Sequence, residues 1–418
     1  MRRFLTVTGF TALLTIMRMF TGIIIAKVVA IYAGPTGMAM LGQLQSLIAT
    51  LSGISNASVG SGLVRYTAEN KSNGYDACKV WWRASLQIAL SLMVVTIVTC
   101  LTFSREIALF VFDNHEYDWI INLAAVCLPL SILNSVVNSI LNGLEEYKKY
   151  IILGILSLII STSLMVSLTA FYGIYGMLVF TSFGAGVSGF ILFILCIRAP
   201  WAKFKFWWGE TTPEARQKIG NYALMAITSA IFGPLSLVLV RNTIIAEAGW
   251  DSAGQWQSVY RISEVYLAVI TTALGTYFLP RLARCKSDIE IVDNILQTLK
   301  VVIPMVIFMS LTIYMLRDFI ILALFTDSFY GARDLFNFQI IGDVLKVASW
   351  VISFPLLSKG MTKGYILSEC IANANFVFLT YLFVMHVGVE GANIAYAVNY
   401  GCYLIFIAFY MHKKLKLR

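Results

Sequence analysis

The sequence contains few charged residues. Asp, Glu, Lys and Arg make up only 13% of its 418 residues, whereas 59% are apolar and the mean hydropathy is +0.78. A soluble domain has about 25% charged and about 45–50% apolar residues, so an ordinary globular, disordered or fibrous protein is excluded. A spanning helix needs about 20 residues, and the apolar residues suffice for about twelve of them. We therefore expect a multi-pass membrane protein.

Motifs of several site classes are missing as well. No GK[ST] phosphate loop occurs, so we expect no ATP hydrolysis by this chain. The dinucleotide-type glycine motif at 184–189 lies inside an apolar helix, where small residues serve helix packing. The three histidines are isolated and no CxxC pair occurs among the seven cysteines, which we interpret as small buried hydrophobes. No metal site and no cofactor are predicted.

Apolar windows of about 18 residues or more predict twelve spanning helices. The alternating segments of about ten residues that build a β-barrel are not found. The predicted fold class is therefore an all-α polytopic membrane protein. The expected bounds of the helices are 4–33, 36–61, 83–112, 117–142, 149–172, 175–198, 217–247, 251–281, 290–316, 333–357, 361–387 and 390–412.

Lys and Arg lie almost entirely on one side of this topology. Of the 31 such residues, 23 are assigned to inner segments and helix ends, five to the interior of the membrane, and only Arg105, Arg317 and Arg333 to outer segments. Positive loops are retained in the cytoplasm, so both termini are expected there, and the protein is expected to be of the inner-membrane type. This distribution explains the net charge of +9 without nucleic-acid binding.

The longest inner loop divides the chain into two halves. We predict an N-terminal six-helix bundle at 1–198, a cytoplasmic linker at 199–216 and a C-terminal six-helix bundle at 217–418. One pentapeptide recurs early in the second helix of each half, as GQLQS at 42–46 and GQWQS at 254–258, and an Ala-Gly turn precedes each copy. Because both copies share one orientation, they indicate parallel repeats, as in transporters with a cavity between two bundles.

Eight of the ionisable residues in the expected helices are the informative set. Each costs about 2.5–3.5 kcal/mol at a helix centre, which makes each a functional candidate. Two helices carry a Gln and a pair of opposite charges at i, i+4 and i+7, at 257, 261 and 264 and at 339, 343 and 346, and therefore have one polar stripe each. The eight residues are Arg18, Lys27, Arg241, Arg261, Glu264, Asp343, Lys346 and Glu369.

More than one interpretation of these charges is open. The opposite charges of a stripe either neutralise each other for insertion or belong to a wet face that looks into a cavity or onto another polar face. Lys27 and Arg241 lie nearer the outer ends of their helices, where they either bind a ligand or reach the lipid headgroups. Arg18 has no anion within a turn, which favours a ligand role for it.

The five cations outnumber the three anions, so a cavity lined by them attracts an anionic head group, and Arg binds phosphate through paired N–H donors. Burial raises and a neighbouring cation lowers the proton affinity of a carboxylate. We therefore predict substrate binding and ion coupling by two sets of residues. The substrate-binding set is Arg18, Lys27, Arg241, Arg261 and Lys346, and the ion-coupling set is Glu264 and Asp343.

The expected outer loops are short. Membrane polymerases and ligases of glycans need a sizeable outer loop for catalytic groups, so an enzyme of that kind is disfavoured. The longest outer connection, 317–333, has an apolar centre that predicts an interfacial helix.

Several short motifs together resemble those of the Wzx-type polysaccharide flippases, in particular the flippases of O-antigen and enterobacterial common antigen repeat units. The similarity is clearest from the seventh to the eleventh predicted helix, and the AGPTG turn at 33–37 supports it in the first half. The other motifs are GQWQS at 254–258, EVYL at 264–267, YFLP at 277–280, LRDF at 316–319 and GDVLK at 342–346.

This resemblance implies the fold of the multidrug/oligosaccharidyl-lipid/polysaccharide exporter superfamily, with two six-helix bundles in a V around a central cavity. It also implies a function in surface polysaccharide and lipopolysaccharide synthesis. The substrate would be an undecaprenyl-pyrophosphate-linked oligosaccharide, which alternating access moves from the cytoplasmic to the periplasmic leaflet. The implied partners are this glycan, membrane lipids, a polysaccharide polymerase and a chain-length regulator.

The resemblance also bears on single residues. It places an acid at Glu264 and carries over to Arg241, Asp343 and Lys346, whereas Arg261 departs from the small polar residue of the family, which we relate to this protein's own sugar. A cation-coupled multidrug exporter of the same fold is the main alternative, although it would favour an acidic cavity. A membrane polymerase or ligase and a passive channel are further alternatives.

Overall fold

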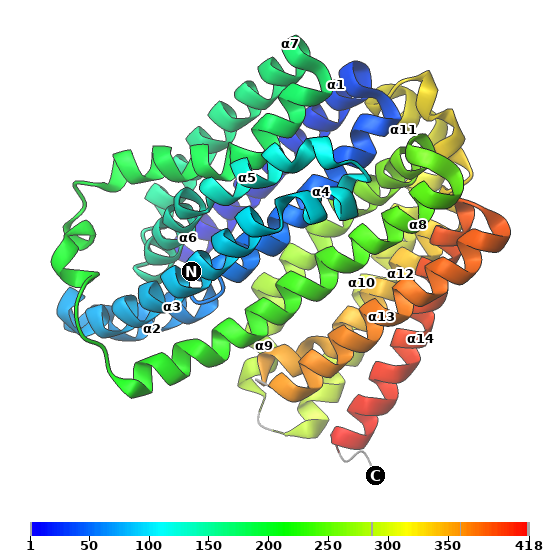
Figure 1. The fold of residues 1–418 in the computed structure, drawn as a ribbon. Coiled ribbons are helices and arrows are strands. Elements are labelled where there is room, and N and C mark those ends of the chain that lie inside the picture. Colours follow the sequence, from blue (N-terminus) through cyan, green and yellow to red (C-terminus); the bar gives the residue numbers. More distant parts are fainter. Residues whose placement is uncertain (1, 286, 360, 416–418) are drawn as a thin grey trace. The chain divides into compact units, whose positions relative to one another are not determined.

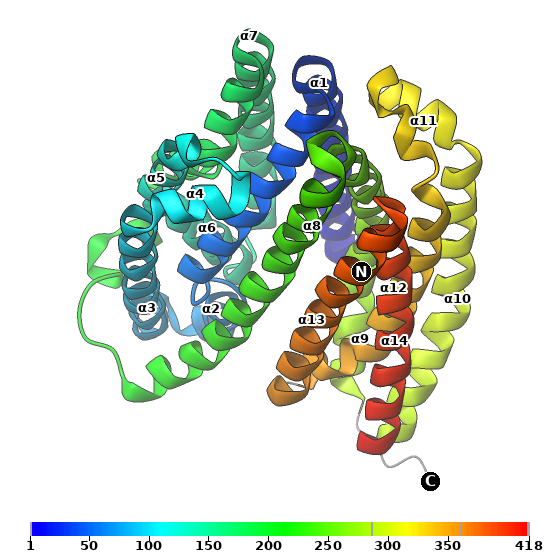
Figure 2. The ribbon, with the colours of Figure 1, turned by 45° about the vertical axis from the view of Figure 1, so that its right-hand side comes forward.

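The computed structural model describes residues 2–285, 287–359 and 361–415. These residues form helices and connecting turns, without a strand (Figures 1 and 2). The chain divides into two compact units, of which unit 1 comprises Met1–Tyr32 and Met40–Leu235, and unit 2 comprises Ala33–Ala39 and Ser236–Arg418. The predicted all-α polytopic fold class is thus confirmed.

The first seven α-helices lie mainly in unit 1, and α8 passes from unit 1 into unit 2. The helices of the N-terminal part are α1 (Arg2–Ser55), α2 (Ser61–Asn70), α3 (Tyr75–Thr102), α4 (Ser104–Phe112), α5 (Asp118–Val126), α6 (Leu128–Gly143) and α7 (Tyr147–Cys196). Those of the C-terminal part are α8 (Pro213–Ala273), a π-helix (Leu274–Phe278), α9 (Leu279–Arg284), α10 (Asp288–Met315), α11 (Arg317–Leu324), α12 (Phe336–Ser358), α13 (Thr362–Val387) and α14 (Glu390–Lys414).

Three of the long helices are broken by a glycine with a positive φ. The angle is 63° at Gly34 in α1, 57° at Gly173 in α7 and 82° at Gly249 in α8. Only glycine adopts this region without strain, so each glycine permits a sharp reversal between two apolar segments. Within the described residues nine helical segments are long and apolar enough to span a membrane. Counting these three as two spans each accounts for the twelve that the sequence predicts.

Three of the predicted bounds are wrong. The span expected at 36–61 ends at Ser55, and the one expected at 83–112 begins at Tyr75 and ends at Thr102, with α4 as a separate helix. The span expected at 117–142 is interrupted at Cys127, because Pro129 in the first turn of α6 has no N–H to continue the helical ladder. The polar stretches at these breaks are short, and windows of about 18 residues average over them. The helix predicted within 317–333 is present as α11.

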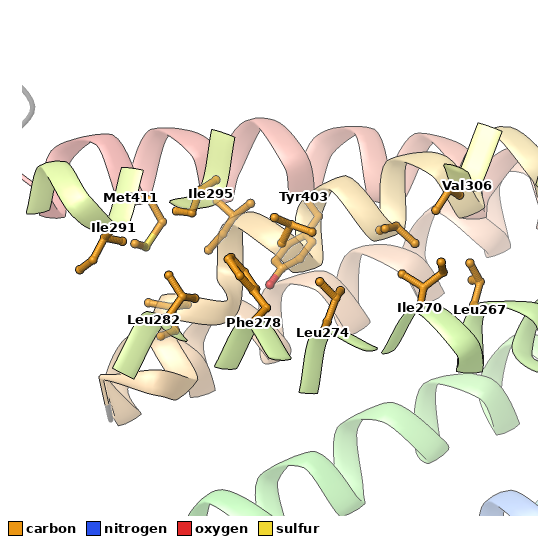
Figure 3. Packing of buried hydrophobic residues seen from close by; sticks show 14 of the residues in the cluster. Leu267, Ile270, Leu274, Phe278, Leu282, Ile291, Ile295, Val306, Tyr403 and Met411 are labelled. Carbon is orange, nitrogen blue, oxygen red and sulfur yellow. The ribbon is translucent and has the colours of Figure 1, made fainter. Parts of the chain in front are cut away.

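The core of unit 2 is an apolar cluster between α8 and the π-helix, α10, α12 and α14. Figure 3 shows Leu274 and Phe278 of the π-helix lying opposite Ile295 of α10 and Tyr403 of α14. Phe278 and Leu274 are 1% and 3% exposed. In a bilayer, close packing of this kind holds helices together, since lipid tails are as apolar as the side chains. The cluster therefore sets the positions of α8, α12 and α14, which carry the candidate site.

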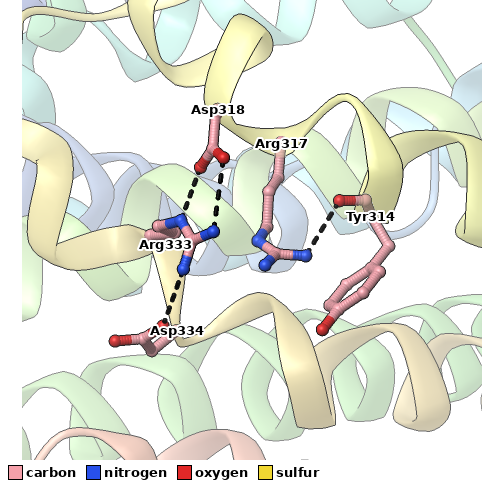
Figure 4. A network of polar contacts seen from close by, with 5 residues as sticks. All are labelled: Tyr314, Arg317, Asp318, Arg333 and Asp334. Carbon is pink, nitrogen blue, oxygen red and sulfur yellow. Dashed lines mark hydrogen bonds and ion pairs between the residues drawn. The ribbon is translucent and has the colours of Figure 1, made fainter.

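The connection from α10 to α12 is held by a polar network that begins at the end of α10 (Figure 4). Arg333 donates from Nε and a terminal nitrogen to the two carboxylate oxygens of Asp318, at 2.7 and 3.4 Å. This hydrogen bond lowers the pKa of the Asp318 carboxyl. The guanidinium of Arg317 lies 4.0 Å from the ring centroid of Tyr314 and donates to the backbone carbonyl of that residue. These contacts fix α11 against the end of α10.

The AGPTG turn of α1 packs directly on the second copy of the pentapeptide. A Cβ atom on Gly254 would overlap the backbone carbonyl of Pro35. Next to this contact, the hydroxyl of Thr36 donates to a carboxylate oxygen of Asp251 at 2.6 Å. Gly254 is therefore needed for a close approach of two backbones, and not for an unusual backbone angle.

We expect Gly254→Ala to lower the free energy of unfolding by about 1–3 kcal/mol, because the added methyl group meets backbone that cannot move aside. Thermal unfolding of the purified protein in detergent measures this effect. Gly220→Ala is the matched control, since Gly220 also lies in α8 but has no heavy atom within 4 Å of the added Cβ. Equal stability of the Gly254 variant and the wild type would show that the turn and α8 are not packed in this way.

Candidate functional site

The polar stripe on α12 is buried inside unit 2. Gln339 and Asp343 have no exposed surface and Lys346 is 7% exposed. Helix α12 packs against α10, α13 and α14. The sequence leaves open whether the polar stripe looks into a cavity or meets another polar face. These contacts fit a stripe that meets another polar face.

Four neutral groups surround the carboxylate of Asp343. Its Oδ2 accepts hydrogen bonds from the hydroxyls of Ser263 and Tyr266 on α8, at 2.6 and 2.5 Å. Its Oδ1 accepts from the hydroxyl of Tyr396 on α14 at 2.8 Å and from the amide of Gln339 at 3.3 Å. Hydrogen bonds to a carboxylate are stronger than those between neutral groups, so this cluster stabilises the charged form.

The cluster also has hydroxyls that can rearrange. A hydroxyl rotates and serves as donor or acceptor, so Ser263 or Tyr266 can accept a hydrogen bond from Asp343 if the carboxylate takes up a proton. The Tyr266 hydroxyl is itself 3.1 Å from that of Ser310 on α10, and Asn393 on α14 donates to Gln339 at 2.8 Å. Hydrogen bonds therefore connect Asp343, directly or through one further group, to α8, α10, α12 and α14.

The ammonium group of Lys346 lies in a cage of aromatic rings. It is 4.9 Å from the ring centroid of Trp350, 5.4 Å from those of Tyr396 and Tyr400, and 5.6 Å from that of Tyr260. The faces of such rings attract a cation, more strongly where water is excluded. The four rings therefore replace part of the hydration that Lys346 loses on burial.

Tyr396 joins the two parts of this site. Its hydroxyl donates to Asp343, while the face of its ring contacts the ammonium of Lys346. The side chain is 1% exposed, and a Cβ atom on Gly342 would overlap its ring. Gly342 thus makes the space in which Tyr396 bridges the buried anion and the buried cation.

Arg241 and Gln257 lie on opposite sides of the Gly249 kink in α8 and bind each other. Nε of Arg241 donates to the amide oxygen of Gln257 at 2.8 Å, and the two residues are 2% and 4% exposed. Burial to this extent argues against the interpretation in which Arg241 reaches the headgroups. The contact links the cation to the GQWQS pentapeptide.

The remaining predicted site residues are more exposed. Arg261 is half-buried and Glu264 is exposed on α8 in unit 2, whereas in unit 1 Arg18 is exposed and Lys27 is half-buried on α1. The polar stripe on α8 therefore runs from a buried to an exposed position, unlike that on α12. Among the predicted residues the structure brings together Asp343 and Lys346, through Tyr396.

The hydroxyl groups around Asp343 were missed by the sequence analysis. Ser263 and Tyr266 flank Glu264 in the sequence, and Asn393, Tyr396 and Tyr400 form a third stripe at i, i+3 and i+7 on α14. A search restricted to charged side chains passes over them. Uncharged polar residues at helical spacing are the signal that could have found α14.

Glu369 is a further acid within a predicted span, to which the sequence analysis assigned no role. It lines a cavity of about 220 Å³ in unit 2 together with Trp350, Tyr365 and Tyr403. Its carboxylate accepts a hydrogen bond from Asn373 at 3.4 Å. Because Trp350 also contacts Lys346, this cavity adjoins the aromatic cage.

Comparison with known sequences gives two matches that bear on this site. The model of a family described as polysaccharide biosynthesis protein matches residues 5–286. The lipid III flippase of Escherichia coli K12 is 27% identical over 410 residues, which cover 94% of each chain. The first match includes α8 with Arg241, Arg261 and Glu264, and the second one extends over most of the chain.

Two solved structures with a similar fold are those of transporters. An inward-facing multidrug resistance transporter of the MATE family and MOP superfamily superimposes with a TM-score of 0.76 at 14% identity, over 96% of this chain and 94% of that one. The lipid II flippase MurJ in an inward closed conformation gives a TM-score of 0.72 at 14% identity, over 97% and 87% of the two chains. At such identity the likeness concerns the fold.

Proposed function

The chain belongs to the polysaccharide biosynthesis protein family, and from this premise we propose that it is a flippase for lipid-linked oligosaccharide units in the inner membrane. The observation that carries the proposal is the match to a lipid III flippase over 94% of both chains. The curated relatives are flippases and not enzymes. The fold shared with a lipid II flippase fits the same activity.

The finer points of the proposal follow from the resemblance to the Wzx-type flippases and, for the orientation, from the positions of Lys and Arg. The substrate is an undecaprenyl-pyrophosphate-linked repeat unit of O-antigen or a related polysaccharide, moved from the cytoplasmic to the periplasmic leaflet by alternating access. Both termini are cytoplasmic, with the two halves 1–198 and 217–418 joined by the inner linker 199–216. A polysaccharide polymerase and a chain-length regulator would act on the product. The excess of Lys and Arg in the predicted inner segments supports this orientation.

The proposed residues divide by exposure. Arg18, Lys27 and Arg261 are exposed or half-buried, which suits direct contact of a cation with the pyrophosphate. Arg241 and Lys346 are also proposed for substrate binding, although in the present state Gln257 and the aromatic cage occupy them. Asp343 and Glu264 are proposed for coupling to a proton or another cation. The hydroxyls around Asp343 support coupling to a proton.

Lipid analysis of a deletion strain tests the proposed function. We expect undecaprenyl-pyrophosphate-linked units to accumulate on the cytoplasmic leaflet while the surface polysaccharide disappears, and the wild-type gene to restore both. Arrival of the units in the periplasm, where they remain unpolymerised, would contradict a flippase and indicate a polymerase or ligase.

We expect Arg241→Glu to lower the surface polysaccharide at least about tenfold. The substitution reverses the charge of a buried side chain next to Gln257. An anionic substrate or partner that must approach this position then meets a negative charge, which costs several kcal/mol. Polysaccharide content is measured in the deletion strain at matched protein levels. Arg105→Gln is the control, since this cation is expected in an outer segment and its side chain is 79% exposed. Unchanged polysaccharide in the Arg241→Glu strain would remove the residue from the mechanism.

A cation-coupled multidrug exporter is the second candidate, and the likeness of fold to a multidrug transporter favours it. The same deletion strain distinguishes the two. Greater susceptibility to cationic drugs with normal surface polysaccharide would support the exporter and contradict the flippase.

A further inference from the structure

A second cavity of unit 2 shares no lining residue with the cavity at Glu369. It has a volume of about 440 Å³ and lies where α8 continues into the π-helix and α9, opposite α10. This volume falls within the range of about 300–1,000 Å³ that small-molecule sites have. None of the residues assigned to substrate binding or ion coupling lines it.

The cavity has apolar walls and one polar end. Its walls come from Ile270, Leu274 and Phe278 on one side and from Val302 and Met305 of α10 on the other. The polar end is formed by Tyr277, Arg281, Gln297 and Thr298. Such a division of polarity suits an amphiphile that has a hydrocarbon chain and a polar head.

Arg281 supplies the charge at the polar end. Of the eleven described residues that line the cavity, it alone is charged. Its guanidinium donates to the amide oxygen of Gln297 at 2.9 Å and to the hydroxyl of Tyr277 at 3.4 Å. A guanidinium has five N–H donors, so these two contacts orient the group and leave donors that can bind the oxygens of a phosphate.

The backbone around the cavity is irregular. The π-helix at Leu274–Phe278 widens the turn that forms one wall, and such turns occur frequently at functional sites. Just before it, the hydroxyls of Thr271 and Thr272 both donate to the carbonyl of Ala268, a contact that bends helices. The end of α8 is therefore shaped around the cavity and does not continue as a regular helix.

From these observations we infer that the cavity binds an anionic glycerophospholipid of the surrounding bilayer, with an acyl chain between the apolar walls and the phosphate at Arg281. Its polar end lies beyond Ala273, where one spanning segment ends, and beside the third turn of the next, α10, and near such helix ends Arg side chains meet headgroups. Charge complementarity selects an anionic over a zwitterionic lipid. This site is additional to flipping and does not depend on the transported substrate.

Native mass spectrometry of the full-length protein in detergent tests the inference. Phosphatidylglycerol and phosphatidylcholine with the same acyl chains are added to the wild type and to three variants. Arg281→Gln removes the charge, and Ala273→Trp fills the apolar part. Arg284→Gln is the matched control, because Arg284 lies one turn further along α9, is exposed and does not line the cavity.

We expect the wild type to bind phosphatidylglycerol about tenfold more tightly than phosphatidylcholine, and Arg281→Gln to abolish that preference. Ala273→Trp should weaken the binding of both lipids about tenfold, whereas Arg284→Gln should change neither more than about twofold. Equal losses in the two arginine variants would overturn the inference. The inference would also be overturned if inorganic phosphate competed for the site as well as phosphatidylglycerol does, or if a polyprenyl phosphate bound more tightly than phosphatidylglycerol. An Ala273→Trp variant that binds both lipids like the wild type would overturn it too. This experiment measures lipid binding and not transport, so a negative result would not contradict the proposed flippase function. A negative result in the deletion strain would likewise not contradict lipid binding at this cavity.

Discussion

Replacing Asp343 with leucine is expected to have the largest effect on folding of any substitution considered, a loss of about 3–5 kcal/mol in the free energy of unfolding. The carboxylate accepts hydrogen bonds from Ser263, Tyr266, Tyr396 and Gln339 in a region without exposed surface. Leucine has a similar volume but leaves these donors without an acceptor, and each such group costs about 1–3 kcal/mol. Thermal unfolding in detergent and the yield of folded protein measure the loss.

Asp343→Asn separates folding from coupling. Its amide oxygen still accepts two of the hydrogen bonds, so the protein should fold, but the side chain no longer takes up or releases a proton. We expect the Asn variant to accumulate at normal levels and to lose transport about 100-fold, a ratio that corresponds to about 2.7 kcal/mol. Ser310→Ala is the control, because Ser310 contacts only the far side of the Tyr266 hydroxyl in the cluster. Normal transport by the Asn variant would exclude Asp343 from ion coupling.

Lys346→Met is expected to have the second largest effect. Methionine fills a similar space without the charge, so the four ring contacts lose their cation and Asp343 loses a positive neighbour three residues away on α12. Desolvated cation–π contacts contribute about 2 kcal/mol. We therefore expect the free energy of unfolding to fall by about 2–4 kcal/mol, measured as for Asp343.

A double-mutant cycle shows whether the two buried charges support each other. If Tyr396 links them as the structure indicates, Lys346→Met combined with Asp343→Asn should be less destabilised than the sum of the two single variants, by about 1–2 kcal/mol. Lys413→Met is the control for loss of a cation, because this residue is exposed near the end of α14. Additive effects within about 0.5 kcal/mol would show that Asp343 and Lys346 act independently.

The sequence predicts the parts of this site that depend on spacing along one helix. Asp343 and Lys346 share a face because they are three residues apart, and Gln339 joins them four residues earlier. The same reasoning places Arg261 and Glu264 on one face of α8, although it did not predict that this face becomes exposed along its length. Spacing defines the face of a helix but not what covers that face.

The sequence by itself determined the class of membrane protein, the number of spans and the location of the charges within them, because hydropathy and helical period are properties of short segments. Only the tertiary structure decided which groups meet. Ser263 lies 80 residues from Asp343, and Tyr396 lies 53 residues from it on another helix. Their contact depends on how α8, α12 and α14 pack, and packing is set by the shapes of many side chains together. The hydroxyl cluster, the aromatic cage and the lipid cavity therefore became visible only in the folded chain.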